Sequence, residues 1–281
     1  HTIIMAAFND EMPPVLFLTP YVAATIAENY MMEGRDVLLV IDDLKRHATV
    51  HREISLLAGM VPGREAYPPD VFYIHSRLLE RGCQHRTGGS ITILPIVETK
   101  GGDITGYIPT NIISITDGQI FLESDLFFSG MRPAVNVGLS VSRVGGAAQT
   151  KAMKKAAGSI RIDLAQFREM EVFTQFASDL DNATKEQLQH GHVLMELLKQ
   201  PLCRPLSMAE QVMTLCAANG RVMLDVPVDH VKDFQMQFLS YMKEQHSDIV
   251  RQLETTKALD DELNKQICDA AEEFKKEFLQ K

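Results

Sequence analysis

One arginine, Arg143, stands between an apolar, strand-like run and a Gly-Gly turn that opens a basic helix. A guanidinium group is planar, forked and permanently charged, so at such a corner it suits contact with a phosphoryl group across an interface. An arginine at a strand end also commonly pairs with a nearby carboxylate or lies in water. The chemistry of Arg143 alone therefore leaves two interpretations open: a phosphate-contacting arginine or an ordinary surface charge.

A carboxylate at the end of another apolar run is the second candidate. Residues 37–41 read Val-Leu-Leu-Val-Ile, an apolar buried strand, and Asp42 and Asp43 follow. In nucleotide-binding α/β domains an acidic residue at such a strand end orients hydrated Mg²⁺ beside the phosphates. Many parallel strands also end in Asp near a helix start, so the signal is weak by itself. Asp42 directly follows the run, and Asp43 is predicted to cap a helix that begins at Leu44.

The motif that would complete a nucleotide site is absent from the sequence. A P-loop requires G-x-x-x-x-G-K-[ST], whose backbone amides and lysine hold the phosphates. None of the 17 glycines is followed by lysine. We therefore predict that any nucleotide site on these 281 residues is half a site.

Composition and charge exclude several other classes of protein. The net charge is −9 and acidic residues are spread along the chain, which argues against a nucleic-acid surface. The four cysteines form no C-x-x-C pair and read as thiols of a reducing compartment. No segment approaches the roughly 20 apolar residues of a membrane span, and the first residues lack the layout of a signal peptide. The chain begins as a strand already under way, as if cut from something longer.

Histidine pairs give no metal-site signal. His47 and His51 are four residues apart on a predicted helix, but no glutamate base or third ligand accompanies them, so packed or exposed helix residues are the better interpretation. His190 and His192 are predicted on a helix surface.

Two halves of the chain differ in pattern. The first alternates short β-branched runs with amphipathic stretches, as a βαβ sheet domain does. Its expected strands are residues 2–8, 37–41, 91–97, 111–116 and 119–122, and its expected helices are 15–33, 44–57 and 70–81. The second half contains only helix candidates, at residues 149–176, 184–199, 207–219, 227–245 and 258–276. We predict a partial α/β nucleotide-binding domain over residues 1–146 and an all-α bundle over 147–281.

Several motifs together resemble a known family along nearly the whole chain. They are the Pro-Gly-Arg-Glu loop of 62–70, His-Ser-Arg-Leu-Leu-Glu-Arg at 75–81, the run 107–123, Ser140-Val-Ser-Arg-Val-Gly-Gly-Ala-Ala-Gln within 132–155, and residues 175–181 with 196–200. This pattern resembles alpha subunits of F-type rotary ATP synthases. The resemblance implies a RecA-like α/β domain whose P-loop part and N-terminal barrel would precede His1.

The resemblance also implies roles for single residues. Arg143 would be an arginine finger that enters the catalytic site of an adjacent beta subunit, with Ser114 lining that interface and Ser140 in the activity-linked stretch. Asp42 would help to hold Mg²⁺, through water, at the alpha subunit's own non-catalytic ATP/ADP site. Arg132, Pro133 and Gln200 would lie near the nucleotide base there, and residues 178–181 would face the rotating central stalk.

The implied assembly is a ring of three alpha and three beta subunits, with the central gamma stalk and the peripheral stalk as further partners. The complex would couple ATP synthesis and hydrolysis to H⁺ or Na⁺ transport through a membrane sector. The chain would be peripheral, on the cytoplasmic face of a bacterial inner membrane or the matrix or stromal face in an organelle.

Departures from the family pattern keep alternatives open. The family's Gln-x-Gln is interrupted because Pro201 and Leu202 follow Gln200, which puts the adenine contacts in doubt, and residues 44–51 differ from the usual Leu-Ser-Lys-Gln pattern. The alternatives are a RecA-like homohexameric export ATPase, with its P-loop upstream, and a truncated paralogue that serves as a scaffold.

Overall fold

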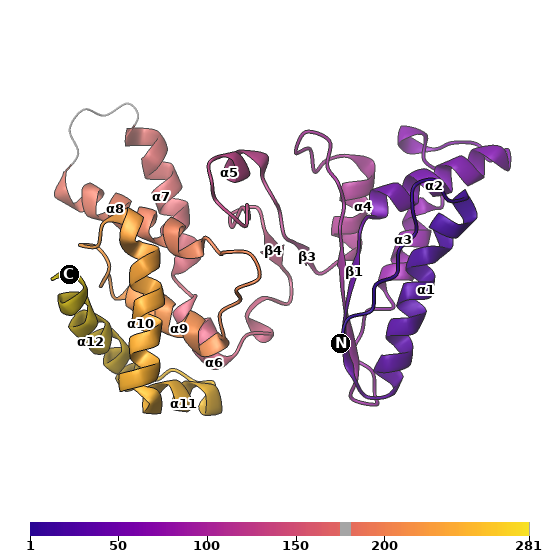
Figure 1. Cartoon of the computed structure of the whole chain (residues 1–281). Helices are drawn as coiled ribbons and strands as arrows, with labels where there is room; N and C mark the ends of the chain where they lie inside the picture. Colours follow the sequence, from indigo (N-terminus) through magenta and orange to yellow (C-terminus); the bar gives the residue numbers. More distant parts are fainter. Residues whose placement is uncertain (175–180, 281) are drawn as a thin grey trace. The chain divides into compact units, whose positions relative to one another are not determined.

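The computed structural model describes residues 1–174 and 181–280. Contacts within the chain divide it into two compact units, His1–Gln119 and Ile120–Lys281, which are described separately (Figure 1). This division differs from the domain boundary expected at residues 146/147, which stays a prediction. The segment expected to face the central stalk, 178–181, lies outside the described residues except for Asp181.

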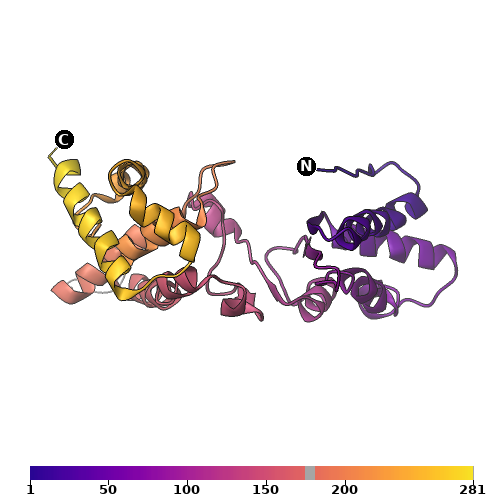
Figure 2. The same cartoon turned by 90° about the horizontal axis from the view of Figure 1, so that it is seen from below.

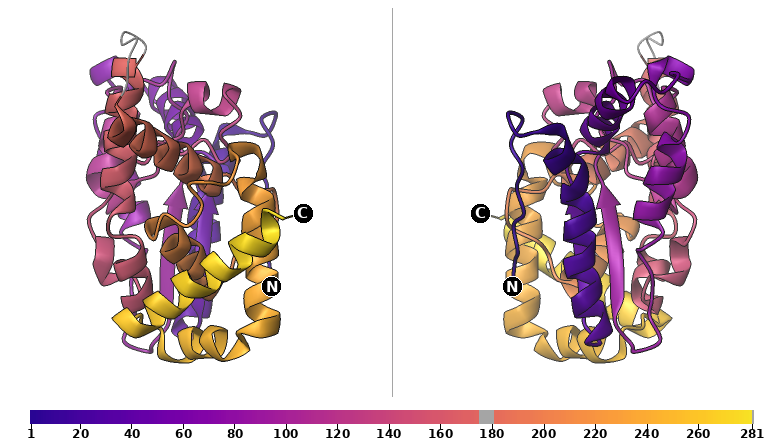
Figure 3. Two further views of the ribbon diagram at one scale, coloured as in Figure 1. Left: turned by 90° about the vertical axis from the view of Figure 1, so that its left-hand side faces the viewer. Right: turned by 90° about the vertical axis from the view of Figure 1, so that its right-hand side faces the viewer.

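The first unit is a parallel pair of strands with helices. Its elements are α1 (Pro13–Met32), β1 (Asp36–Ile41), α2 (Leu44–Leu57), the short helix η1 (Arg64–Ala66), α3 (Val71–Leu79), β2 (Ser90–Pro95), α4 (Tyr107–Ile115) and β3 (Gly118–Gln119). Strands β1 and β2 pair from Asp36 opposite Ser90 to Ile41 opposite Pro95, and α2 and α3 lie in the connection between them. Helix α1 runs alongside both strands (Figure 3, right).

Local signals place the helix that follows β1. The side chain of Asp43 accepts a hydrogen bond from the backbone N–H of Arg46 at 2.6 Å, which satisfies one free donor of the first turn. The predicted cap is therefore confirmed, and α2 spans residues 44–57 as expected.

One face of the strand pair is open, contrary to the prediction of a fully buried strand. Ile41 and Ile91 are buried toward the helices, whereas Leu38 is 62% and Val40 52% exposed. Side chains alternate between the two faces of a strand, and parallel sheets normally have both faces covered. In the described part of the chain β1 and β2 form a two-stranded sheet. The apolar run 37–41 therefore predicted more burial of β1 than the structure shows.

Two expected strands are absent. Residues 2–8 carry no regular secondary structure and run as an extended segment toward α1 (Figure 2). Residues 111–115 belong to helix α4 and Thr116 is its C-cap, because Ile108 and Ile112, four residues apart, are both buried on one face against the neighbouring elements. Packing against α3 and α2 outweighs the β propensity of the isoleucines.

Histidines join the first three helices of this unit. His75 on α3 is fully buried, and its Nε2 lies 3.3 Å from Nδ1 of His47 on α2. Nε2 of His47 lies 3.1 Å from the carbonyl of Phe17 on α1. Burial lowers the pKa of His47 to about 4, and burial followed by the charges of the neighbouring histidines lowers that of His75 to about 3. His47 and His51 are thus packed helix residues, as predicted.

The second unit is mainly helical. Its elements are α5 (Ser124–Phe128), β4 (Val141–Ser142), η2 (Gly145–Ala147), α6 (Lys151–Ala156), α7 (Ile160–Thr174), α8 (Asn182–Leu198), α9 (Met208–Asn219), η3 (Val228–His230), α10 (Val231–Gln245), α11 (Ser247–Thr256) and α12 (Asp261–Phe278). The single helix expected over residues 149–176 is two helices, separated by a turn at 157–159. Helix α11 was not expected.

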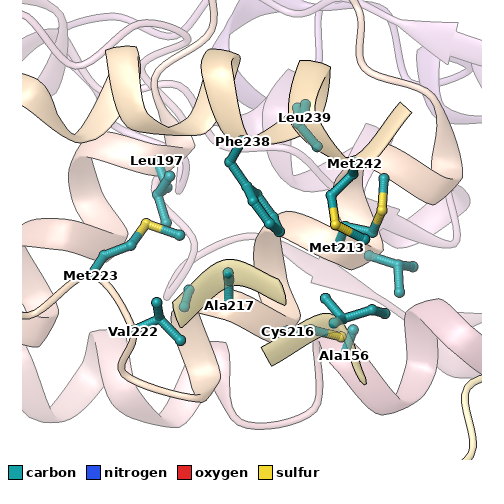
Figure 4. Packing of buried hydrophobic residues seen from close by; sticks show 14 of the residues in the cluster. Ala156, Leu197, Met213, Cys216, Ala217, Val222, Met223, Phe238, Leu239 and Met242 are labelled. Atoms are coloured by element: carbon teal, nitrogen blue, oxygen red, sulfur yellow. The ribbon is translucent and has the colours of Figure 1, made fainter. Parts of the chain in front are cut away.

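A large hydrophobic core holds these helices together. Phe238 from α10 points toward Ala217 on α9, with Leu197, Met223 and Met242 close by (Figure 4). Helix α9 begins with a capping box, in which Ser207 and Glu210 each accept a hydrogen bond from the other's backbone.

Within the described residues, no helix combines the length and apolar character that crossing a membrane requires.

The contact between α7 and α8 leaves room only for glycine at position 191. A Cβ atom built on Gly191 would lie 2.0 Å from Cδ2 of the buried Phe167 ring. His190 beside it is buried, so the expected surface position is wrong for His190, while His192 is exposed.

We predict that Gly191→Ala destabilises the helical unit. Overpacking of a filled core typically costs about 1–3 kcal/mol, and here the added methyl group must displace Phe167. Urea unfolding followed by circular dichroism measures the change. Gly158→Ala is the matched control, since its Cβ would lie 3.4 Å from the nearest atom, an ordinary contact. Equal stability of the two variants would contradict the packing argument.

We also predict that acid weakens the first unit before its carboxylates protonate. Neutral His47 and His75 contribute full stability above the unfolded value of about 6.5. Because burial depresses the pKa of both, the unfolded chain binds more protons, and stability falls as pH drops from about 6.5 toward 4 and 3. Unfolding free energies measured from pH 7 to 5 should show this slope. His47→Gln should flatten it, whereas the exposed control His230→Gln should leave it unchanged.

Candidate functional site

Arg143 occupies an exposed corner of the second unit. It lies between β4 and η2, and the turn after it is closed by a hydrogen bond from the Gly145 N–H to Oγ of Ser142 at 3.0 Å. Gly145 has φ +54°, in the left-handed region that favours glycine. The turn leads to the short basic helix α6, which Thr150 caps. The predicted corner between a strand and a Gly-Gly turn is therefore present.

The segment before Arg143 is fixed by pairing with an earlier segment. The N–H of Asn136 donates to the carbonyl of Phe121 at 2.9 Å, and the N–H of Glu123 donates to the carbonyl of Ala134 at 2.9 Å. Oγ of Ser140 accepts from the Phe121 N–H at 3.0 Å and donates to the Asn136 carbonyl at 2.7 Å. Ser140 thus has a structural place in the loop that carries Arg143.

Asn136 is a residue that sequence reasoning did not single out. Its side chain is buried, its Oδ1 accepts from the N–H groups of Gly138 and Leu139, and its Nδ2 donates to Glu123 Oε2 at 2.8 Å. Arg168 on α7 donates to the same Oδ1 at 2.9 Å. Asn136 lies within the run 132–155 that carried the family resemblance, so the sequence held a signal for it, whereas nothing in the sequence pointed to Arg168.

Arg132 and Gln200 are brought together. The N–H of Gln200 donates to the Arg132 carbonyl at 2.8 Å, and the Arg132 guanidinium lies 4.4 Å from the centre of the Phe127 ring. The Arg132–Pro133 peptide bond is cis. Leu202, which replaces the expected second glutamine, is 91% exposed. The three residues expected near a nucleotide base therefore form one exposed group.

Asp42 and Ser114 belong to the first unit. Asp42 lies exposed directly after β1, at the carboxyl end of a parallel strand, where open α/β sheets bind ligands. Its peptide bond to Asp43 is cis. Ser114 is exposed on α4 and donates to the Asn111 carbonyl at 2.7 Å. Ser114 is thus on a helix, not on the expected strand.

The exposed carboxylate of Asp42 suits contact with a hydrated cation better than an enclosed metal site. Across residues 1–174 and 181–280, no group of three or more His, Cys, Asp or Glu side chains could hold a metal ion. Mg²⁺ characteristically keeps several waters and binds through one or two carboxylates together with phosphates. Asp42 suits that arrangement when phosphates are supplied by a bound nucleotide, and Arg143 can neutralise charge on a phosphoryl group.

Family models match both parts of the chain. Residues 1–142 match the nucleotide-binding domain of the ATP synthase alpha/beta family, and residues 149–274 match the C-terminal domain of the ATP synthase alpha/beta chain. The predicted order, a nucleotide-binding α/β domain followed by a helical C-terminal domain, is confirmed.

Similar proteins are named ATP synthase subunit alpha. One from Clostridium kluyveri is 51% identical over 99% of this chain and 56% of its own length. Another, from Petrotoga mobilis, is 52% identical over 98% of this chain and 55% of its own length. The chain thus spans a little over half the length of these relatives.

The fold and the exposed arginine corner define the class: a nucleotide-binding α/β domain joined to a helical domain. The chain belongs to the ATP synthase alpha/beta family, and within it the chain is alpha-subunit-like.

Proposed function

We propose that this chain forms part of the alpha subunit of an F-type ATP synthase and that Arg143 reaches the catalytic site of an adjacent beta subunit. The observation that carries the proposal is the exposed Arg143 at a hydrogen-bonded corner, in a chain about half identical to proteins named ATP synthase subunit alpha. A rigid guanidinium stabilises the charge that develops on a transferred phosphoryl group.

The chain's own residues suit a supporting role in the reaction. No P-loop lies among the 281 residues, and the exposed face of β1 suits a complete subunit in which further elements cover that face. Arg143 would bind and orient the phosphoryl group held by the beta subunit. Asp42 would orient hydrated Mg²⁺, which when bound neutralises phosphate charge, at a non-catalytic nucleotide site. Arg132, Pro133 and Gln200 would border the base, and Ser114 would lie at the subunit interface.

The proposed assembly alternates three alpha with three beta subunits around a central gamma stalk, with a peripheral stalk outside. It would interconvert ATP with ADP and phosphate and couple this to H⁺ or Na⁺ transport. The chain would be peripheral to the membrane, on the cytoplasmic face in bacteria or the matrix or stromal face in an organelle, and would bind no nucleic acid. The domain boundary would fall near residue 146, in the gap between the two family matches.

We predict that Arg143→Lys abolishes most sustained ATP hydrolysis. Lysine keeps the charge but lacks the fork, and loss of an arginine finger costs about 10³–10⁵ in rate. Steady-state hydrolysis would be measured in a complex of beta and gamma subunits with an alpha subunit that contains these residues. Arg251→Lys, an exposed position on α11, makes the same chemical change as a control. Near-normal turnover in Arg143→Lys would refute the finger.

We predict that Asp42→Asn weakens Mg²⁺-dependent nucleotide binding by the alpha subunit. Removal of a carboxylate that acts through bound water costs about 10–100-fold in metal affinity. Calorimetric titration of ATP with and without Mg²⁺ separates this effect from binding of the nucleotide itself. Asp43→Asn is the matched control, because asparagine also caps a helix. Absence of nucleotide binding in the unaltered subunit would instead favour the scaffold alternative.

A further inference from the structure

The turn before Arg143 is built around a single buried side chain. Oδ1 of Asn136 accepts hydrogen bonds from the N–H groups of Gly138 at 2.9 Å and Leu139 at 3.1 Å. The Asn136 carbonyl accepts from the Ser140 N–H at 3.0 Å and from the Ser140 hydroxyl at 2.7 Å. Residues 136–140 therefore close on Asn136, and Arg143 follows three residues later.

The amide of Asn136 is held in one orientation by two charged groups. Its Nδ2 donates to the carboxylate of Glu123 at 2.8 Å, and its Oδ1 accepts from the guanidinium of Arg168 at 2.9 Å. Hydrogen bonds to charged groups are stronger than neutral ones. A buried amide that loses such a partner is left with a costly unpaired group. Glu123 and Arg168 thus fix the turn from opposite sides of the amide.

Helix α7 is the element that supplies this support. Arg168 lies beside Phe167, which is buried against α8, and Arg161 on the same helix donates to the Gly138 carbonyl at 3.5 Å. The approach is close, since a Cβ atom on Gly138 would lie 3.3 Å from Asn136 Oδ1 and 3.4 Å from Arg168 Nη1. The turn is therefore attached to a helix that is itself anchored in the hydrophobic core.

We propose that Asn136 and Arg168 are positioning residues, which hold the 136–140 turn against α7 and so aim Arg143 at the phosphoryl group. This inference rests on the proposed function of Arg143. A misplacement of about 1 Å in a group that must meet a reacting phosphate can cost about 100-fold in rate. A side chain that touches no substrate can thus control turnover.

Reversal of one hydrogen bond provides the test. Asn136→Asp keeps the size of the side chain and its acceptor oxygen but turns the Nδ2 donor into a charged oxygen facing Glu123. Glu123→Gln in the same subunit restores a donor at this contact, with the hydrogen bond reversed. Arg168→Ala removes the support from α7, and Arg251→Ala on α11 is the control. All would be made in an alpha subunit that contains these residues, assembled with beta and gamma subunits.

Two readouts are measured on each complex. Hydrogen–deuterium exchange reports the backbone amides of 138–140, and steady-state hydrolysis gives kcat and KM. We expect Asn136→Asp and Arg168→Ala to speed exchange and to lower kcat by about 10–100-fold with little change in KM. The double variant Glu123→Gln/Asn136→Asp should recover both the slow exchange and the kcat of the unaltered complex.

The outcomes separate this inference from the proposed function. Unchanged exchange in Asn136→Asp and Arg168→Ala would overturn the positioning role whatever the activity. Faster exchange with normal kcat would also overturn it, provided that Arg143→Lys has lost turnover. Retained turnover in Arg143→Lys would refute the finger instead. In that case the exchange rates alone decide whether Asn136 and Arg168 hold the turn.

Discussion

The hydrogen bonds of Asn136 join an exposed loop to a helix of the hydrophobic core. Arg168, which donates to Asn136, lies on α7. Its neighbour Phe167 is buried against Gly191, where α7 and α8 pack closely. Beyond that contact lies the core around Phe234 and Phe238, both with no exposed surface. The position of the Arg143 corner thus depends on a short series of contacts from loop to helix to core. An exposed arginine without such a series of contacts would sample many positions.

The two units differ in how completely they bury their own apolar surface. The helical unit surrounds its core with α6 to α12. Thr150, Asp181, Ser207 and Asp260 cap α6, α8, α9 and α12 respectively. The first unit buries one face of its strand pair and leaves Leu38, Val40 and Leu94 exposed on the other. Parallel strands are usually covered on both faces because βαβ connections place helices there. The same unit carries Asp42 but no phosphate cradle. Incomplete burial and an incomplete site are therefore found in the same unit.

The chain carries only part of the set of groups that holds a phosphate. The chain supplies the forked positive charge of Arg143 and the exposed carboxylate of Asp42, whereas the lysine and backbone amides of a P-loop are absent from its sequence.

The buried histidines of the first unit impose a separate constraint. His47 and His75 lie between α1, α2 and α3 as neutral hydrogen-bonded rings, so the first unit has placed titratable groups inside its smaller core. Burial, and not a charged partner, is the main cause of their lowered pKa values.

The sequence by itself determined what depends on near neighbours along the chain. The span of α2, the cap at Asp43, the end of β1 before Asp42 and the turn after Arg143 all follow from residue types a few positions apart. The run around Arg143 also indicated the family. Only the tertiary structure decided the rest. Residues 111–115 form part of a helix because Ile108 and Ile112 pack together against other elements, and Leu38 is exposed because nothing described covers it. Asn136 and Arg168 are separated by 32 residues. Their contact depends on how α7 packs, and local sequence patterns carry no information about packing between elements distant in the sequence.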